Sequence, residues 1–197
     1  MTSILRGAKF YTSVPTLGDL SDASIGEVVF AGRSNAGKSS VLNVLTDQKQ
    51  LAHVSKTPGK TQLLNYFLVK DGRYLVDLPG YGYAKVPAKI KQNWEKTLSE
   101  YLVVRAQIKG FIVVMDIRHP LTEQDLVFLE WIAPCDKPVC LLLNKSDKLK
   151  ESSSRKILKH VRDWAVGQPL ECDVNLFSAK KKIGVQKVQK TIESWLF

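Results

Sequence analysis

The sequence predicts a doubly wound α/β fold, with a mostly parallel sheet of six strands, one antiparallel edge strand among them, and helices on both faces. Short apolar runs of strand length alternate with longer stretches in which apolar residues recur every three or four positions. Polar motifs follow several of these runs directly, at the sheet edge where doubly wound folds bind ligands. The 197 residues suit one domain. We expect a lead-in segment over residues 1–24 that packs on a domain spanning 25–197.

The expected strands differ in how they pair. Asp71 and Gly72 form a strong hairpin signal between the runs Leu63–Val69 and Arg73–Leu78, so these two strands should be antiparallel. The continuous apolar run inside Gly110–Asp116 is typical of a buried parallel strand. The remaining strands are expected over Glu27–Ala31, Val139–Leu143 and Val174–Phe177.

Helices are expected over Lys38–Leu45, from about residue 88 to 104, over Thr122–Ile132, over Ser153–Ala165 and at the end of the chain. One of the serines at 152–154 can cap the fourth of them. In the second, fourth and last helices, the apolar residues share one face and should point into the core. These residues are Ile90, Trp94, Leu98, Tyr101 and Leu102, then Ile157, Val161, Trp164 and Ala165, and finally Val185, Val188, Ile192, Trp195 and Leu196.

The composition indicates a cytoplasmic protein without stable membrane insertion. No apolar run approaches the ~18 to 20 residues of a membrane span, and Met1–Val14 lacks the features of a secretory signal. The three cysteines, Cys135, Cys140 and Cys172, are scattered, which favours reduced thiols over a disulfide or a metal site.

The net charge of +10 suggests a polyanionic partner. Nucleic acid is the commonest such partner, and an anionic membrane surface is the next. A solvated lysine-rich face is the alternative that needs no partner.

The first expected strand runs into a complete G-x-x-x-x-G-K-[ST] phosphate loop. Its glycines let successive amide N–H groups point inward, and the following helix adds its positive end. Lys38 would reach the terminal phosphates, and the Ser39 hydroxyl would ligate magnesium. A glycine turn without a ligand is the alternative. The residues expected to bind phosphate are Gly32, Arg33, Ser34, Asn35, Ala36, Gly37, Lys38 and Ser39.

The motif Asp77-Leu78-Pro79-Gly80 ends the third expected strand. Asp77 can hold magnesium, and the Gly80 amide can approach a terminal phosphate because no side chain stands in the way. Many nucleotide hydrolases place a glutamine just after this motif to orient water, but this chain has Tyr81. The intrinsic hydrolysis rate should therefore be low.

Two motifs near the ends of later strands indicate a guanine site. The Asp147 carboxylate of Asn144-Lys145-Ser146-Asp147 can accept hydrogen bonds from N1–H and the 2-amino group of guanine, which adenine lacks. Asn144 and Lys145 would brace the loop and cover the base. Backbone N–H groups of Ser178 and Ala179, after the last expected strand, could meet the guanine oxygen.

The polar stretch between Thr46 and Gln62 is expected to be a long mobile loop. Magnesium needs a second hydroxyl that arrives only when the third phosphate is present. Thr57 and Thr61 are the candidates. We favour Thr61, because it lies just before the Leu63 strand while the loop can pivot on Pro58 and Gly59.

Together, these motifs resemble those of the EngB (YihA/YsxC) family of bacterial P-loop GTPases, within the TrmE-Era-EngA-EngB-septin-like group. The resemblance spans nearly the whole chain. It rests on the phosphate loop and on Thr57–Gln62, Asp77–Ala84 and Asn144–Asp147.

The resemblance implies a small GTPase that hydrolyses GTP to GDP and phosphate. It also implies assembly of the large ribosomal subunit as the role, with a requirement in normal cell division and septation. We expect a monomer. By position, the first switch (Gly59, Lys60, Thr61, Gln62 and Leu63) and Asp77, Leu78, Pro79 and Gly80 would bind the nucleotide phosphates and magnesium. Asn144, Lys145, Ser146, Asp147, Phe177, Ser178 and Ala179 would form the base site.

Asn35 offers a way to compensate for the missing glutamine. It is similar to an asparagine that ligates potassium beside the phosphates in related GTPases, where the ion can replace an arginine finger. We therefore place Lys38, Thr61, Gly80 and Asn35 in the catalytic set, with potassium stimulation as a hypothesis. The alternative is that Asn35 only shapes the loop.

Two function classes remain open from the sequence. In the first, a GTP-controlled assembly factor docks on ribosomal RNA through basic residues: Lys85, Lys89, Lys91, Arg155, Lys156, Lys159 and Arg162. In the second, a protein-interaction switch acts at the division site or the inner membrane surface without direct RNA binding.

Overall fold

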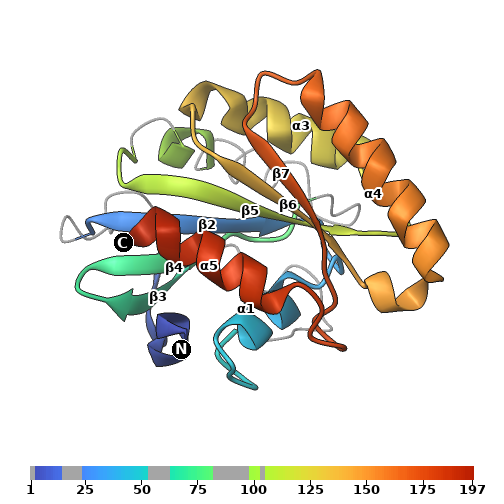
Figure 1. Cartoon of the computed structure of the whole chain (residues 1–197). Coiled ribbons are helices and arrows are strands. Elements are labelled where there is room, and N and C mark those ends of the chain that lie inside the picture. The colour runs from blue at the N-terminus through green and yellow to red at the C-terminus, as the bar shows by residue number, and fades with distance from the viewer. Residues whose placement is uncertain (1–2, 15–23, 53–62, 82–97, 103–104) are drawn as a thin grey trace.

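A computed structural model describes residues 3–14, 24–52, 63–81, 98–102 and 105–197 of the chain (Figure 1). Its centre is a seven-stranded sheet in the order β1-β3-β4-β2-β5-β6-β7. The strands are β1 (Lys9–Val14), β2 (Gly26–Gly32), β3 (Leu64–Lys70), β4 (Arg73–Asp77), β5 (Ile108–Asp116), β6 (Val139–Asn144) and β7 (Cys172–Leu176).

The sheet is parallel from β4 through β7, and β3 is antiparallel to both β4 and β1. The mostly parallel α/β class is thus confirmed, but the sheet has one more strand than expected. The additional strand is β1, which lies within the expected lead-in segment and replaces β3 at the antiparallel edge. Exposed Phe10 and Tyr11 and a register shift between Phe10 and Thr12 disrupt its alternation, so the sequence shows no strand period there. The domain boundary at residue 25 stays a prediction.

The helices are α1 (Lys38–Leu45), α3 (Glu123–Ile132), α4 (Glu151–Val166) and α5 (Val185–Leu196), with short 3-10 turns at Ile4–Gly7, Ala133–Cys135 and Ser146–Lys148. Figure 1 shows α1 and α5 on one side of the sheet and α3 and α4 on the other. Residues 98–102 are helical, and Leu98, Tyr101 and Leu102 are buried as expected. The rest of the helix expected over 88–104 lies almost entirely outside the described residues.

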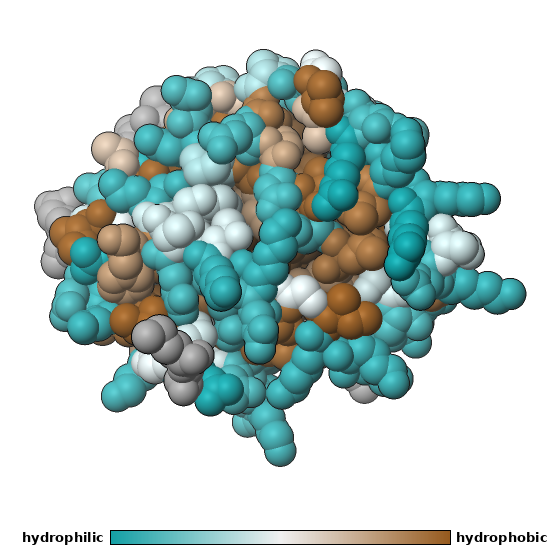
Figure 2. Space-filling model, in the orientation of Figure 1, coloured by the Kyte–Doolittle hydropathy of each residue, from teal (hydrophilic) through white to brown (hydrophobic). Residues whose placement is uncertain are grey.

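Two apolar layers enclose the sheet. Val28 and Phe30 of β2 face the layer with α1 and α5, whereas Val29 and Ala31 face the layer with α3 and α4. Successive side chains of β2 alternate between these two layers, and every residue of the strand is buried. Because both layers are apolar, the sequence of the strand is a continuous apolar run. In Figure 2 the outward surfaces of α4 and α5 are covered mostly by hydrophilic residues, in line with their one-sided burial.

The start of α3 agrees with the sequence-based expectation, whereas the start of α4 differs from it. Thr122 caps α3 through a full capping box with Asp125. The serine cap expected for α4 is wrong, because the helix begins at Glu151 after Lys150 and no side chain caps it. Ser154 is instead buried inside the first turns of α4, where its hydroxyl lies 3.5 Å from the carbonyl oxygen of Ser146.

Candidate functional site

The phosphate loop connects β2 to α1 in a conformation that requires its glycines. Gly37 has φ +98°, and a Cβ there would lie 2.5 Å from Nδ2 of Asn144. A Cβ on Gly32 would lie 2.6 Å from the carbonyl oxygen of Val114 on the neighbouring strand β5. Asn35 also has a positive φ, of 66°, and is exposed. The loop therefore has the tight backbone that a phosphate nest needs.

Lys38 and Asp77 form an ion pair at the centre of the site. The parallel register that aligns Phe30 with Asp77 places the end of β4 beside the phosphate loop. Both side chains are nine-tenths buried. The structure thus brings together the expected phosphate ligand and the expected magnesium ligand.

Gly80 and Tyr81 lie against the phosphate loop. The amide of Ser34 donates to the carbonyl oxygen of Tyr81 at 3.0 Å, and a Cβ on Gly80 would lie 3.2 Å from the same amide nitrogen. The Tyr81 ring is buried and stacks on Phe128 at 5.0 Å between centroids. Its hydroxyl donates to Asp125 of α3, and burial, together with that carboxylate, raises the pKa of Tyr81 well above its usual value. Tyr81 therefore points into the core.

Asn144 and Lys145 brace the phosphate loop from the end of β6. Nδ2 of Asn144 donates to the carbonyl oxygen of Ala36 at 2.9 Å, and its Oδ1 accepts the amide of Ala179 at 3.4 Å. Nζ of Lys145 donates to the carbonyl oxygen of Asn35 at 2.6 Å. The bracing expected from the sequence is present in this geometry.

Asp147 is joined to the loop that follows β7. The Ser178 hydroxyl donates to Oδ1 of Asp147 at 2.5 Å, and this hydrogen bond is the main cause that lowers the pKa of Asp147. Ser178 is fully buried and also accepts the amide of Lys181 at 3.0 Å. The hydrogen bond from Ser178 therefore favours the ionised form of Asp147, the form that accepts guanine N–H groups.

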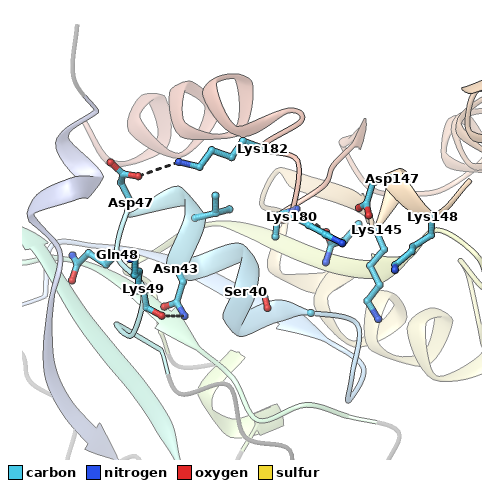
Figure 3. Close-up of a pocket in the computed structure, with 14 residues that line it drawn as sticks. Ser40, Asn43, Asp47, Gln48, Lys49, Lys145, Asp147, Lys148, Lys180 and Lys182 are labelled. Carbon is cyan, nitrogen blue, oxygen red and sulfur yellow. Dashed lines mark hydrogen bonds and ion pairs between the residues drawn. The ribbon is translucent and has the colours of Figure 1, made fainter.

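A groove of about 560 Å³ extends from these loops along α1 (Figure 3). Four of the residues expected for the base site, Asn144, Lys145, Asp147 and Ala179, line one of its walls, and α1 with the segment after it forms the other. Ser146, Phe177 and Ser178 do not line the groove. The lining residues are Gly37, Ser40, Asn43, Val44, Asp47, Gln48, Lys49, Asn144, Lys145, Asp147, Lys148, Ala179, Lys180 and Lys182.

The sequence reasoning missed two residues that shape this groove. Asp116, at the end of β5, accepts Nζ of Lys145 at 2.9 Å and a two-point contact from Arg118. Burial would raise the pKa of Asp116, but the hydrogen bonds from Arg118 and Lys145 outweigh it and lower the pKa. Asn43 binds both the amide and the carbonyl oxygen of Ala52. Asp116 could have been found from the sequence, because it is a polar residue at the carboxyl end of a parallel strand. No local sequence feature indicates a role for Asn43.

Several predicted residues lie outside the described part of the chain. These are Thr57, Gly59, Lys60, Thr61 and Gln62 of the loop before β3, and the basic residues Lys85, Lys89 and Lys91. Their roles stay predictions.

Comparison with known proteins decides the family. Residues 27–145 match the sequence model of a family described as 50S ribosome-binding GTPase. The chain is 49% identical over 188 residues to the probable GTP-binding protein EngB of Idiomarina loihiensis, covering 95% of this chain and 91% of that protein. The chain belongs to the EngB family of GTP-binding proteins. This EngB-family protein is also 50% identical over 186 residues to the probable GTP-binding protein EngB of Serratia proteamaculans, covering 94% and 86% of the two chains.

The fold agrees with solved structures of P-loop GTPases. The crystal structure of a probable GTP-binding protein engB superposes with a TM-score of 0.68 at 20% identity, covering 87% of this chain and 98% of that one. The EngB-family chain thus binds GTP and GDP and is a GTPase. Among the described residues, no helix is both long and apolar enough to cross a membrane.

Proposed function

We propose that this EngB-family GTPase is a nucleotide-controlled assembly factor of the large ribosomal subunit, required for normal cell division and septation. The observation that carries the proposal is the match of residues 27–145 to a family described as 50S ribosome-binding GTPase. The net charge of +10 supports it, since a basic surface attracts ribosomal RNA. The protein would act in the cytoplasm as a monomer.

The phosphate loop residues Gly32–Ser39 bind the phosphates in this proposal, and Ser39, Thr61 and Asp77 hold Mg²⁺. The hydroxyl and carboxylate oxygens of Ser39 and Asp77 suit this hard cation. The Lys38–Asp77 ion pair supports the assignment, because it keeps both groups beside the loop. When the nucleotide binds, Lys38 would turn to the phosphates, which would leave the Asp77 carboxylate free to act as a metal ligand. Mg²⁺ held there would supply positive charge that offsets the negative charge of the phosphates.

The base site in this proposal consists of Asn144–Asp147 and Phe177–Ala179. Asp147 accepts the two guanine donors, and the Ser178 hydrogen bond orients its carboxylate for them. Backbone N–H groups of the Ser178 loop meet the guanine oxygen. An unpaired carboxylate would penalise ATP, which gives selectivity for GTP.

Hydrolysis would be slow without help. Tyr81 replaces the usual glutamine and is buried against Phe128, so it cannot orient water at the phosphates. Asn35 stands exposed on the phosphate loop and can ligate K⁺ there, which would add positive charge to the transition state. Lys38, Thr61 and the Gly80 amide complete the catalytic set.

The third phosphate orders the first switch (Gly59–Leu63) and Asp77–Gly80, and its loss on hydrolysis releases them. Ribosome binding should therefore depend on the nucleotide. The test is cosedimentation with purified large ribosomal subunits, in GDP and in a non-hydrolysable GTP analogue, over a range of salt concentrations.

Salt-sensitive binding that is stronger with the GTP analogue is the expected result. Absence of binding in both nucleotides would overturn the ribosomal role. It would favour a protein-interaction switch at the division site or inner membrane surface.

A further inference from the structure

Three exposed lysines lie on the two loops that follow β6 and β7, and we call Lys148, Lys180 and Lys181 the lysine rim. Lys148 and Lys180 line the groove on either side of Asp147, and Figure 3 shows both beside that carboxylate. Lys181 follows next in the chain. The rim therefore borders the base end of the nucleotide groove.

The two loops form one platform. Besides the Ser178–Asp147 hydrogen bond, the amide of Ser146 donates to the carbonyl oxygen of Phe177 at 3.0 Å. The second loop closes on itself, since Ser178 and Ile183 exchange two backbone hydrogen bonds of 3.1 Å. The lysines thus extend from two loops that hydrogen bonds join to each other.

Within the described part of the chain, no ion pair includes Lys148, Lys180 or Lys181, and the nearby Asp147 carboxylate offsets part of the positive charge of Lys148 and Lys180. Lys145 differs from them, because it directs its amino group inward to Asp116 and Asn35. The rim lysines are therefore available to an external anion.

Most of the cationic side chains of α4, which the sequence suggested for RNA docking, contact carboxylate or carbonyl oxygens of the chain itself. Arg155 pairs with Glu151, and Lys159 pairs with Asp163 at 2.8 Å. Arg162 donates to the carbonyl oxygen of Val174 on the edge strand β7 at 3.0 Å. Glu151 and Asp163 thus offset two of the four positive charges that α4 carries on arginine and lysine.

We propose that the lysine rim docks a single-stranded segment of RNA, and that RNA docked there slows the release of GDP. The choice of RNA rests on the proposed ribosomal function. Lysine contacts to phosphates release counterions and supply most of the affinity in such complexes. Because Asp147 and Ala179 lie on the same two loops, RNA that bridges Lys148 and Lys180 holds the base end of the groove together. Where the slower release appears as a higher affinity for GDP, linkage requires that GDP strengthen RNA binding by that same factor, relative to the nucleotide-free protein.

The rim suits RNA better than an anionic membrane. Membrane-surface sites usually combine cations with an exposed apolar helix face. Along residues 145–148 and 178–183, all of them described, Ile183 is the one large apolar side chain that is exposed. The adjacent helix α5 turns Val188, Ile192 and Leu196 into the core.

The test compares two triple variants of the full chain that each lose three positive charges, Lys148→Gln/Lys180→Gln/Lys181→Gln and the control Arg155→Gln/Lys156→Gln/Lys159→Gln. Binding to a single-stranded oligoribonucleotide, to large ribosomal subunits and to phosphatidylglycerol vesicles is measured as a function of salt. Release of a fluorescent GDP analogue is measured with and without the oligoribonucleotide, so that each variant is its own reference. Melting temperatures check that both variants fold.

Loss of three phosphate contacts should make the plot of log association constant against log salt concentration shallower by about 2. RNA binding should weaken about 100-fold at 0.1 M salt. The rim variant should also lose the several-fold slowing of GDP release by RNA, while the α4 control keeps both properties. If the wild type binds ribosomal subunits and the rim variant binds them equally well, the inference about the rim is overturned while the proposed function stands. Absence of wild-type binding would overturn the proposed function as well. Rim-dependent binding to phosphatidylglycerol vesicles without RNA binding would assign the rim to a membrane instead.

Discussion

The Tyr81 hydroxyl donates a hydrogen bond of 2.9 Å to Oδ1 of Asp125, and both residues are buried. The other oxygen of Asp125 accepts the amide and the hydroxyl of Thr122 at 3.0 and 2.7 Å, which closes the first turn of α3. The backbone of Tyr81 is bonded to Ser34 of the phosphate loop. One residue thus ties the phosphate loop, the Gly80 amide and helix α3 together.

Tyr81→Phe should destabilise the fold by about 1–3 kcal/mol, because Asp125 loses a partner while it stays buried. The stacking on Phe128 is kept, so the change isolates the hydroxyl. The GTP analogue should lose more affinity than GDP, since Gly80 is expected to contact only the third phosphate. Titration calorimetry with both nucleotides measures the ratio. Equal losses for the two nucleotides would show that the hydroxyl serves stability alone.

Asn35→Ala should remove potassium stimulation of hydrolysis. In the wild type, we expect faster GTP turnover in potassium chloride than in sodium chloride, because K⁺ at Asn35 would stabilise the charge that develops at the phosphates. Phosphate release in matched concentrations of the two salts measures the effect. Equal wild-type rates in both salts would contradict the hypothesis and leave Asn35 as a residue that shapes the loop.

Ser178→Ala should change the pH dependence of guanine-nucleotide binding. In the wild type, the lowered pKa of Asp147 keeps the acceptor ionised, so affinity should hold from neutral pH to below the ordinary aspartate value of about 3.9. Loss of the Ser178 hydrogen bond raises this pKa toward its ordinary value, and affinity should then fall at a higher pH on acidification. GDP dissociation constants over an acidic pH series, limited to where the melting temperature is unchanged, test this. If the pH profiles of wild type and variant coincide, they argue against Asp147 as the acceptor of guanine.

Glu27→Ala should destabilise the fold by about 3–5 kcal/mol and leave nucleotide affinity little changed. Glu27 is fully buried at the amino end of β2 and accepts both Nε and Nη2 of Arg105, at 2.9 and 2.7 Å. Removal of the Glu27 carboxylate takes away the negative charge that offsets buried Arg105. The phosphate loop follows the opposite end of the same strand. Denaturant unfolding and GDP titration separate the two effects, and a loss of GDP affinity in a folded variant would show that the network reaches the site.

The sequence predicted most elements closely, because their signals are local. Helix Lys38–Leu45 has the expected bounds, and the Asp71-Gly72 turn joins the expected antiparallel pair. Strand β1 escaped prediction because an edge strand with exposed aromatic residues and a bulge has no regular alternation. The start of α4 was misplaced because three serines suggested a cap, although the backbone enters the helix before them.

The order and chemistry of the motifs were therefore determined by the sequence alone: a phosphate loop after the first parallel strand, an aspartate and a glycine after the strand beside it, and a guanine motif farther along. These depend on residue type and short spacing. Only the tertiary structure decided the contacts between them. Lys38 with Asp77, Tyr81 with Asp125 and Lys145 with Asn35 join residues 39, 44 and 110 positions apart. Such pairs are set by sheet register and helix packing, which sum weak preferences over the whole chain and leave no local signal at either partner.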